Sequence, residues 1–275
     1  MQWTAGRVRV TRIVELESLG GTRFILPQAS REEVQALPWL EPDFADGEGR
    51  MKMTIHALVV ETPNRRILID SGLGNDKQDR SIPAWNNLAT PFLERLAEAG
   101  YPAESIDTVV CTHLHVDHVG WNTRLVEGRW LPTFPAARYL FGRAEYDHWA
   151  AKPPAHFVDS VAPVMAAGQG ALYDADSRIA DVISLIPTPG HSPGHFSLLI
   201  SSQGESLLLA GDAAHHPIQL AHLDWCSTAD FDTGQAIRSR LMLAERFAGS
   251  DTRVIGGHFA GGRIVRDGAA FRLAM

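Results

Sequence analysis

The sequence of 275 residues predicts an α/β protein, because strand-like apolar segments and amphipathic helical segments are both present along it. Segments rich in β-branched residues or leucine are expected to be buried strands at residues 106–111, 183–186, 206–210 and 253–255. Apolar residues at helical spacing predict helices at residues 91–99, 143–151, 158–167 and 233–248. A histidine or an aspartate follows each of these strands within a few residues, so the strand ends are where a functional site is expected.

The N-terminal part of the chain predicts a strand followed by a hairpin. Alternating apolar residues from Arg7 to Leu16 indicate an opening strand. The segments Thr54 to Val60 and Arg66 to Ile69 indicate a hairpin that turns at Pro63-Asn64. Asp70-Ser71-Gly72 closes this hairpin, and Asp70 is typical of a turn residue before glycine.

Metal-capable side chains cluster directly after the strand at 106–111. They are His113, His115, Asp117 and His118. Two residues of extended chain place the first two imidazoles on the same side, while the other two groups point back from the following turn. If no metal were bound, burying these groups together would cost several kcal/mol per ion. The cluster therefore predicts a metal site, and its imidazole and carboxylate ligands suit zinc as well as iron, manganese or cobalt.

Further candidate ligands follow the later strands. His191 lies in the loop Pro187-Thr188-Pro189-Gly190-His191, Asp212 follows Gly211, and His258 follows Gly256-Gly257. Glycine allows positive φ and a close approach of the backbone to a metal. The repeated order of strand, glycine and ligand predicts that these side chains belong to the same site as the first cluster.

The chain resembles the metallo-β-lactamase superfamily, whose His-X-His-X-Asp-His signature is intact at His113 to His118. The resemblance covers nearly the whole chain and implies an αββα sandwich of two mixed sheets with helices on the outer faces. It implies two Zn²⁺ ions, with Fe, Mn or Co as alternatives. The ligands that it implies are His113, His115 and His191 at one ion, Asp117, His118 and His258 at the other, and Asp212 between the two. It also implies that Asp70 supports a ligand histidine, and the alternative is a turn residue before glycine.

The segment from Asp212 to Gln219 resembles the N-acyl homoserine lactonase and methyl parathion hydrolase-like branch of the superfamily. Two metals about 3.5 to 4 Å apart share a water and lower its pKa toward about 7, which supplies a bridging hydroxide as the nucleophile. The expected reaction opens a lactone or ester, either acyl-homoserine-lactone-like or an aryl ester. The alternatives are an organophosphate triester, a β-lactam or a thioester on the same site, or a non-hydrolytic metal-binding or redox member of the superfamily.

Catalytic roles are expected for Asp117, Asp212 and His215. Asp117 would relay a proton to the leaving group, and His215 would hydrogen-bond the substrate or a ligand. His195 and His216 are expected to be structural rather than ligands. Trp121 either walls an apolar part of the pocket or packs in the core, and the substrate is expected to carry an apolar portion.

Composition agrees with a single metallo-β-lactamase-like domain over residues 1–275. The resemblance to lactonases implies an N-terminal arm of about residues 1–50, which is expected to cover the site or to form a homodimer interface. A formal net charge of -7 argues against nucleic acid as a partner. No signal peptide or membrane span is recognisable, which predicts a cytoplasmic protein without a membrane partner. Cys111 and Cys226 are too few for a disulfide framework.

Overall fold

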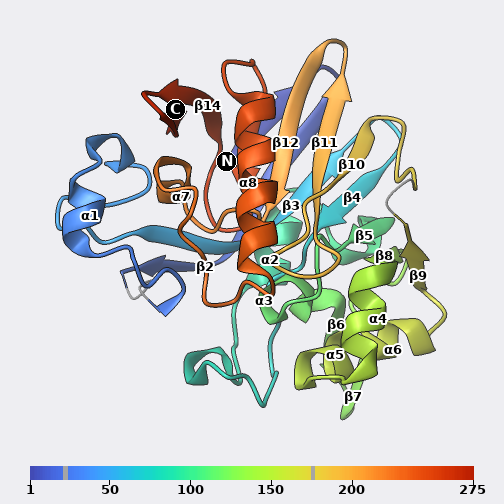
Figure 1. Ribbon diagram of the computed structural model, residues 1–275. Helices are drawn as coiled ribbons and strands as arrows, with labels where there is room; N and C mark the ends of the chain where they lie inside the picture. The colour runs from blue at the N-terminus through green and yellow to red at the C-terminus, as the bar shows by residue number, and fades with distance from the viewer. Residues whose placement is uncertain (21–23, 175–176) are drawn as a thin grey trace. The chain divides into compact units, whose positions relative to one another are not determined.

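The structure is a computed structural model that describes residues 1–20, 24–174 and 177–275 (Figure 1). The chain forms two compact units. Unit 1 comprises Met1–Leu16 and Ile55–Ser177, and unit 2 comprises Glu17–Thr54 and Arg178–Met275. The predicted N-terminal arm falls into both units, except for residues 21–23, which lie outside the described part. The assignment of residues 1–275 to one domain stays a prediction.

A seven-stranded sheet carries most of unit 1. Its order is β1 (Gln2–Ala5), β2 (Val8–Leu19), β3 (Lys52–Glu61), β4 (Arg66–Ile69), β5 (Thr108–Val110), β8 (Arg138–Gly142) and β9 (Gly170–Tyr173). Strands β3 and β4 pair antiparallel, with Leu58 opposite Ile69, which confirms the predicted hairpin. Strands β4, β5, β8 and β9 pair in parallel, so the sheet is mixed. A separate ribbon pairs β6 (Thr123–Val126) with β7 (Arg129–Pro132).

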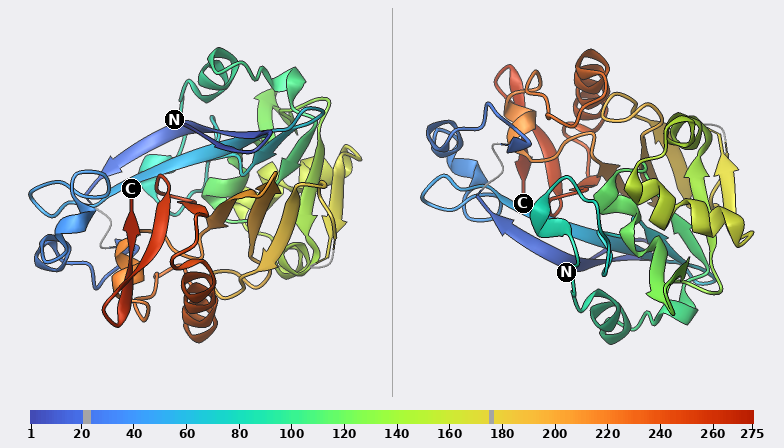
Figure 2. Two further views of the ribbon diagram at one scale, coloured as in Figure 1. Left: turned by 90° about the horizontal axis from the view of Figure 1, so that it is seen from above. Right: turned by 90° about the horizontal axis from the view of Figure 1, so that it is seen from below.

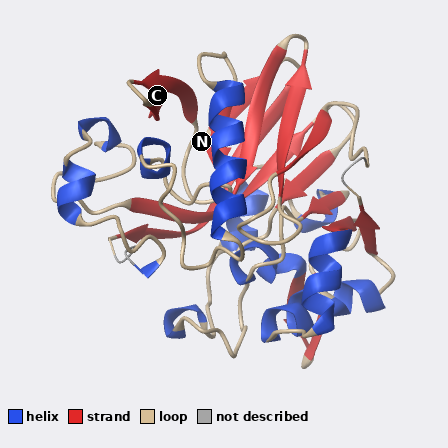
Figure 3. Ribbon diagram, in the orientation of Figure 1, coloured by secondary structure: helices blue, strands red, loops and turns tan. Residues whose placement is uncertain are grey.

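The helices of unit 1 pack around this sheet and bury its apolar side chains. They are α2 (Phe92–Glu98), α3 (Val116–Val119), α4 (Arg143–Ala151), α5 (Ala155–Ser160) and α6 (Ala162–Ala166), and Figure 3 shows them as short helices between the strands. The core contains Phe92, Tyr139 and Phe141, each fully buried. The single helix expected at 158–167 is wrong: the chain breaks near Val161, since Pro163 lacks an N–H and fits only the first turn of a new helix.

Unit 2 is built on a six-stranded mixed sheet. Its order is β10 (Ile183–Pro187), β11 (Phe196–Ser202), β12 (Glu205–Gly211), β13 (Arg253–Gly256), β14 (Gly262–Asp267) and β15 (Ala270–Ala274). Only the pairing of β12 with β13 is parallel among these described strands. The helices of unit 2 are α1 (Arg31–Gln35), α7 (Ile218–Ala221) and α8 (Thr233–Phe247), and α8 lies against one face of the sheet (Figures 1 and 2). Leu243, Ala244 and Phe247 of α8 join the core of this unit. Two mixed sheets with helices confirm the predicted α/β class.

A buried ion network ties together three segments of unit 1. The Lys77 ammonium donates to Thr123 Oγ1 at 2.7 Å, lies 3.6 Å from Asp159 Oδ1 and sits 3.6 Å from the centre of the Trp130 ring. Arg80 Nη2 binds the same Asp159 carboxylate at 3.0 and 2.9 Å. Desolvation lowers the pKa of Lys77 to about 7, although Asp159 opposes the shift. The pKa of a lysine in an unfolded chain is about 10.4. Between this pH and about pH 7, the folded protein therefore binds fewer protons than the unfolded chain.

Lys77→Met is therefore expected to change how stability depends on pH. The free energy of unfolding of the unmodified protein, relative to that of the variant, should rise by roughly 2 kcal/mol from pH 7 to pH 9, because the cost of protonating the buried amine disappears. Below pH 7 the difference should be constant. Urea unfolding at pH 6, 7 and 9 measures it. Parallel stability curves for the two proteins would show that Lys77 stays fully protonated in the fold.

Candidate metal centre

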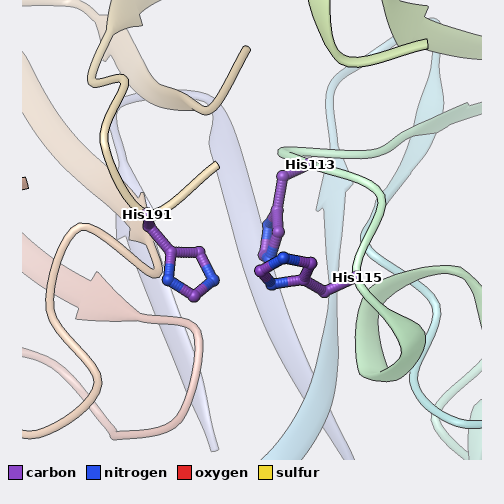
Figure 4. A group of neighbouring side chains, drawn as sticks. All are labelled: His113, His115 and His191. Carbon is purple, nitrogen blue, oxygen red and sulfur yellow. The ribbon is translucent and has the colours of Figure 1, made fainter. Parts of the chain in front are cut away.

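The loop after β5 brings the predicted histidines of unit 1 together. The ring centroids of His113 and His115 lie 4.6 Å apart, and those of His113 and His118 lie 4.0 Å apart. His115 occupies the residue before α3, and Asp117 and His118 lie inside this helix. Figure 4 shows His113 and His115 projecting from this loop. The sequence-based expectation that these side chains meet at a strand end is met within the unit.

Asp70 and Thr112 orient the imidazoles of unit 1. Asp70 Oδ2 lies 2.9 Å from His118 Nδ1, and Asp70 Oδ1 accepts the Thr112 amide at 2.8 Å. The Thr112 hydroxyl donates to the Asp70 carboxylate and lies 3.0 Å from His113 Nδ1. A carboxylate only accepts, so His118 carries its proton on Nδ1, and His113 does the same toward the hydroxyl. Both rings therefore present an unprotonated Nε2, which is the form that binds a metal. Of the two interpretations of Asp70, the geometry favours the support of a ligand.

Glu15 holds the loop that carries Asp70. Its carboxylate accepts the amides of Leu73 at 2.6 Å and Gly74 at 3.2 Å, and the indole N–H of Trp121 at 2.7 Å. Burial raises the pKa of Glu15, and these donors oppose the rise. Trp121 is 4% exposed and stacks on Phe92 with ring centroids 5.4 Å apart, so the structure supports core packing for this residue.

In unit 2, imidazole nitrogens converge on the carboxylate of Asp212. Oδ2 of Asp212 lies 3.5 Å from His191 Nε2, 3.4 Å from His215 Nε2 and 3.0 Å from His258 Nε2. Asp212 follows Gly211 at the end of β12, and His258 follows β13, which is parallel to β12. His191 lies in the loop after β10, from which it projects in Figure 4. Parallel pairing brings the ends of β12 and β13 to the same edge of the sheet.

The outer nitrogens of these rings are occupied by acceptors. His191 Nδ1 lies 3.0 Å from Asp230 Oδ1, and His258 Nδ1 lies 3.1 Å from the carbonyl oxygen of Thr54. Because carboxylates and carbonyls only accept, both rings carry a proton on Nδ1, and both Nε2 atoms face Asp212. With a proton on Nε2, His258 donates to the Asp212 carboxylate at 3.0 Å; with a metal ion in place of that proton, the same nitrogen is a ligand. Imidazole nitrogens around a buried carboxylate are a donor set that zinc uses, so unit 2 fits a metal ion.

Burial shifts the pKa values of His215 and Asp230 away from their ordinary range. The pKa of His215 is lowered to about 3, chiefly by desolvation; Asp212 opposes this shift, and His191 and His258 add to it. Desolvation also raises the pKa of Asp230. His215 is therefore a neutral imidazole at physiological pH, with a lone pair on one nitrogen.

Two other histidines of unit 2 are structural, as the sequence predicted. His195 Nε2 accepts the amide of Asp212 at 2.9 Å, while its Nδ1 lies 2.8 Å from the Thr188 hydroxyl. His216 Nε2 lies 2.9 Å from the carbonyl oxygen of Phe44, and burial lowers the pKa of His216 to about 4. Both rings hold backbone in place.

Sequence reasoning missed Asp230, Thr112 and the carbonyl of Thr54. Asp230 follows no recognisable motif and lies 39 residues from His191 in the chain. In the sequence it is an acidic residue shortly before a helix, which is typical of a capping position. The actual cap of α8 is Asp232, which accepts the Gln235 amide.

Asp230→Asn is expected to weaken metal retention about tenfold or more, since the neutral amide holds His191 less strongly and places an NH₂ group against the Ser227 amide. Competition with a chelating dye measures this affinity. Asp232→Asn is the matched control, because it removes the same charge two residues away while asparagine still caps the helix. Equal affinities for the two variants would remove Asp230 from the support of His191.

Comparison with known proteins assigns the chain to a family. The model of the metallo-β-lactamase superfamily matches residues 52–258, and the chain belongs to this superfamily. It is a metal-dependent hydrolase with the metallo-β-lactamase fold. Among the residues that the structure describes, no helix combines the length and apolar character needed to cross a bilayer.

Relatives within the family include lactonases. An N-acyl homoserine lactonase of Bacillus cereus is 26% identical over 207 residues, which cover 71% of this chain and 77% of the relative. A probable metallo-hydrolase of Mycobacterium tuberculosis is 26% identical over 188 residues, covering 58% of this chain and 57% of the relative.

Solved structures agree with the fold. A hydrolase of the β-lactamase superfamily, AbOPH, superposes with a TM-score of 0.81 at 26% identity and covers 99% of this chain and 95% of its own. The dizinc quorum-quenching lactonase AidC, in complex with the product N-hexanoyl-L-homoserine, superposes with a TM-score of 0.79 at 21% identity, covering 100% and 96%.

Proposed function

We propose that this protein is a dinuclear zinc hydrolase that opens a lactone or ester with an apolar portion, of the acyl-homoserine-lactone type. One ion would be held by His113, His115 and His191, and the other by Asp117, His118 and His258. Asp212 would serve both ions. The observation that carries the proposal is the convergence of imidazole Nε2 atoms on the buried Asp212 carboxylate, with the Nδ1 atoms of His191 and His258 held by acceptors.

Bound zinc ions would supply Lewis acidity toward a carbonyl oxygen and a water of lowered pKa. The chain itself supplies position and proton transfer. Asp70 and Asp230 fix the tautomers of His118 and His191, which keeps their Nε2 atoms available. Asp117 would take a proton and deliver it to the leaving alkoxide of the opened ring. Because Asp212 is almost fully buried, its negative charge acts with little screening by solvent.

The choice of a lactone rests on the relatives. Curated N-acyl homoserine lactonases are 24 to 26% identical to this chain over 71% of its length. A further solved lactonase structure holds N-hexanoyl-L-homoserine at its catalytic metal centre. These similarities support a small-molecule substrate with an acyl chain, and the formation of a homodimer through the N-terminal residues stays a prediction.

A substrate panel on the zinc-loaded protein tests the proposal. N-hexanoyl-homoserine lactone, a simple γ-lactone, an aryl ester, a phosphotriester and a β-lactam are compared by kcat/KM, with ring opening followed by proton release. We expect the acyl-homoserine lactone to be the best substrate, and we expect chelation to stop turnover and added zinc to restore it. A phosphotriester or a β-lactam preferred over every lactone would overturn the proposed substrate class.

A further inference from the structure

His215 belongs to the group of donors around Asp212. Ligand atoms of His191, Asp212 and His215 all lie within 4.8 Å of one another, and all three side chains are buried. The distances from Asp212 Oδ2 to the Nε2 atoms of His191 and His215 are 3.5 and 3.4 Å. Zinc bonds of about 2.0 to 2.2 Å in a tetrahedron separate two ligand atoms by about 3.3 to 3.5 Å. Typical N–H···O hydrogen bonds are shorter, at about 2.7 to 3.2 Å. The spacing therefore matches two ligands of one ion better than a hydrogen-bonded pair.

The ring of His215 is held in this position by its surroundings. The amide of His215 donates to Gln219 Oε1 at 2.7 Å, and Gln219 Nε2 donates to the carbonyl of Trp225 at 2.9 Å. The ring lies edge-on to His191 at 4.6 Å between centroids and stacks on His258 at 5.7 Å. Nδ1 of His215 is buried, and no group in the described part of the chain bonds to it. The His215 ring is thus held by the hydrogen bond of its backbone amide to Gln219 and by packing against His191 and His258.

Charge in this cluster also favours a cation. The Asp212 and Asp230 side chains are 3% and 1% exposed. The guanidinium of Arg240 donates to the carbonyls of Ala213, Leu223 and Trp225, and its charge also acts on Asp230. The Asp212 carboxylate is surrounded by imidazoles, and a divalent ion would compensate its buried charge.

We propose that His215 is a metal ligand, and that His191, Asp212 and His215 retain a metal ion even when the ligands of unit 1 are absent. This adds an eighth side chain to the seven ligands that the sequence pattern implies and replaces the substrate contact expected for His215. The inference shares metal binding with the proposed function but does not depend on the substrate.

Metal binding to full-length protein tests the inference apart from catalysis. The starting protein carries His113→Ala, His115→Ala, Asp117→Ala and His118→Ala, which removes the four proposed ligands of unit 1, and it is stripped by chelation and titrated with Co²⁺ and with Zn²⁺. We expect one tightly bound ion per chain, with a visible Co²⁺ spectrum. Adding His215→Gln should raise the Kd of this ion at least tenfold and weaken the spectrum, because one nitrogen ligand is lost. Adding His222→Gln is the matched control, since His222 stacks on Trp225 and is absent from the Asp212 group.

Each outcome decides the inference. An unchanged Kd with His215→Gln, or no ion retained once the four proposed ligands of unit 1 are replaced, overturns it. Unfolding of the metal-free variants by denaturant shows whether the fold is intact, and a thermal shift on adding Zn²⁺ gives a second measure of affinity if the spectrum is weak. Hydrolysis of the substrate panel is scored separately, so failure of the lactone proposal leaves these binding results valid.

Discussion

Replacing Asp212 with alanine is expected to lower hydrolytic turnover by roughly three orders of magnitude or more, because the carboxylate that faces His191, His215 and His258 is lost. Metal content should fall with it. Without metal, the variant should be as stable as the unmodified protein or slightly more stable, since a buried charge is removed while the backbone amide of residue 212 still binds His195. The stabilisation that added zinc gives the unmodified protein should be absent.

Metal analysis, turnover and thermal unfolding with and without zinc check this expectation. Asp251→Ala is the matched control, because its carboxyl group is 97% exposed and lies in the same unit. His118→Ala tests the ligands of unit 1 in the same way. An Asp212→Ala protein that retained turnover with a full complement of metal would contradict a metal-binding role for this carboxylate.

Gly120→Ala is expected to destabilise the protein by about 3 to 5 kcal/mol. An added Cβ would lie 1.8 Å from the carbonyl oxygen of Leu73 and 1.9 Å from its carbon. Two backbone hydrogen bonds, from Gly120 to Gly72 at 2.7 Å and from Trp121 to Ser71 at 2.8 Å, hold these segments at this separation. Backbone cannot move aside as a side chain does, so the two segments must part.

The same substitution should weaken metal binding in unit 1. Asp70 lies two residues before Gly72 and His118 lies two residues before Gly120, so pushing these segments apart would disturb the hydrogen bond between Asp70 and His118. Urea unfolding and zinc affinity measure the two effects. Gly234→Ala is the control: its added Cβ meets only ordinary contacts at 3.5 Å in the first turn of α8, and alanine should stabilise the helix by up to about 1 kcal/mol. A Gly120→Ala protein as stable as this control would show that the close approach is not needed.

The ligands were predictable because each follows a strand within a few residues. The strands before His113, His191, Asp212 and His258 lie within one or two residues of the expected bounds. An apolar β-branched run signals a strand locally, and a strand fixes the direction in which the next side chains leave it. The fold class followed from the same runs and from the intact signature at residues 113–118.

The supports of the ligands were not predictable, because they are set by tertiary contacts. Thr54 acts through its backbone carbonyl, which any residue could provide. Glu15 follows the apolar alternation of an opening strand, where an acidic residue is typical of a solvent-facing position, yet the structure buries it among donors. Asp230 reaches His191 from a distant segment. Periodicity and motifs carry no information about such long-range pairs.

The anchoring of the segment before α8 has an evolutionary consequence. Phe231 stands between Asp230, which binds His191, and Asp232, which caps α8, and its amide donates to the carbonyl of His191. Its own side chain is nevertheless 63% exposed. The contact to His191 is made by the backbone amide of residue 231, so any residue that has an amide N–H preserves it. Proline alone lacks this donor, and natural variation at position 231 is therefore expected to exclude proline.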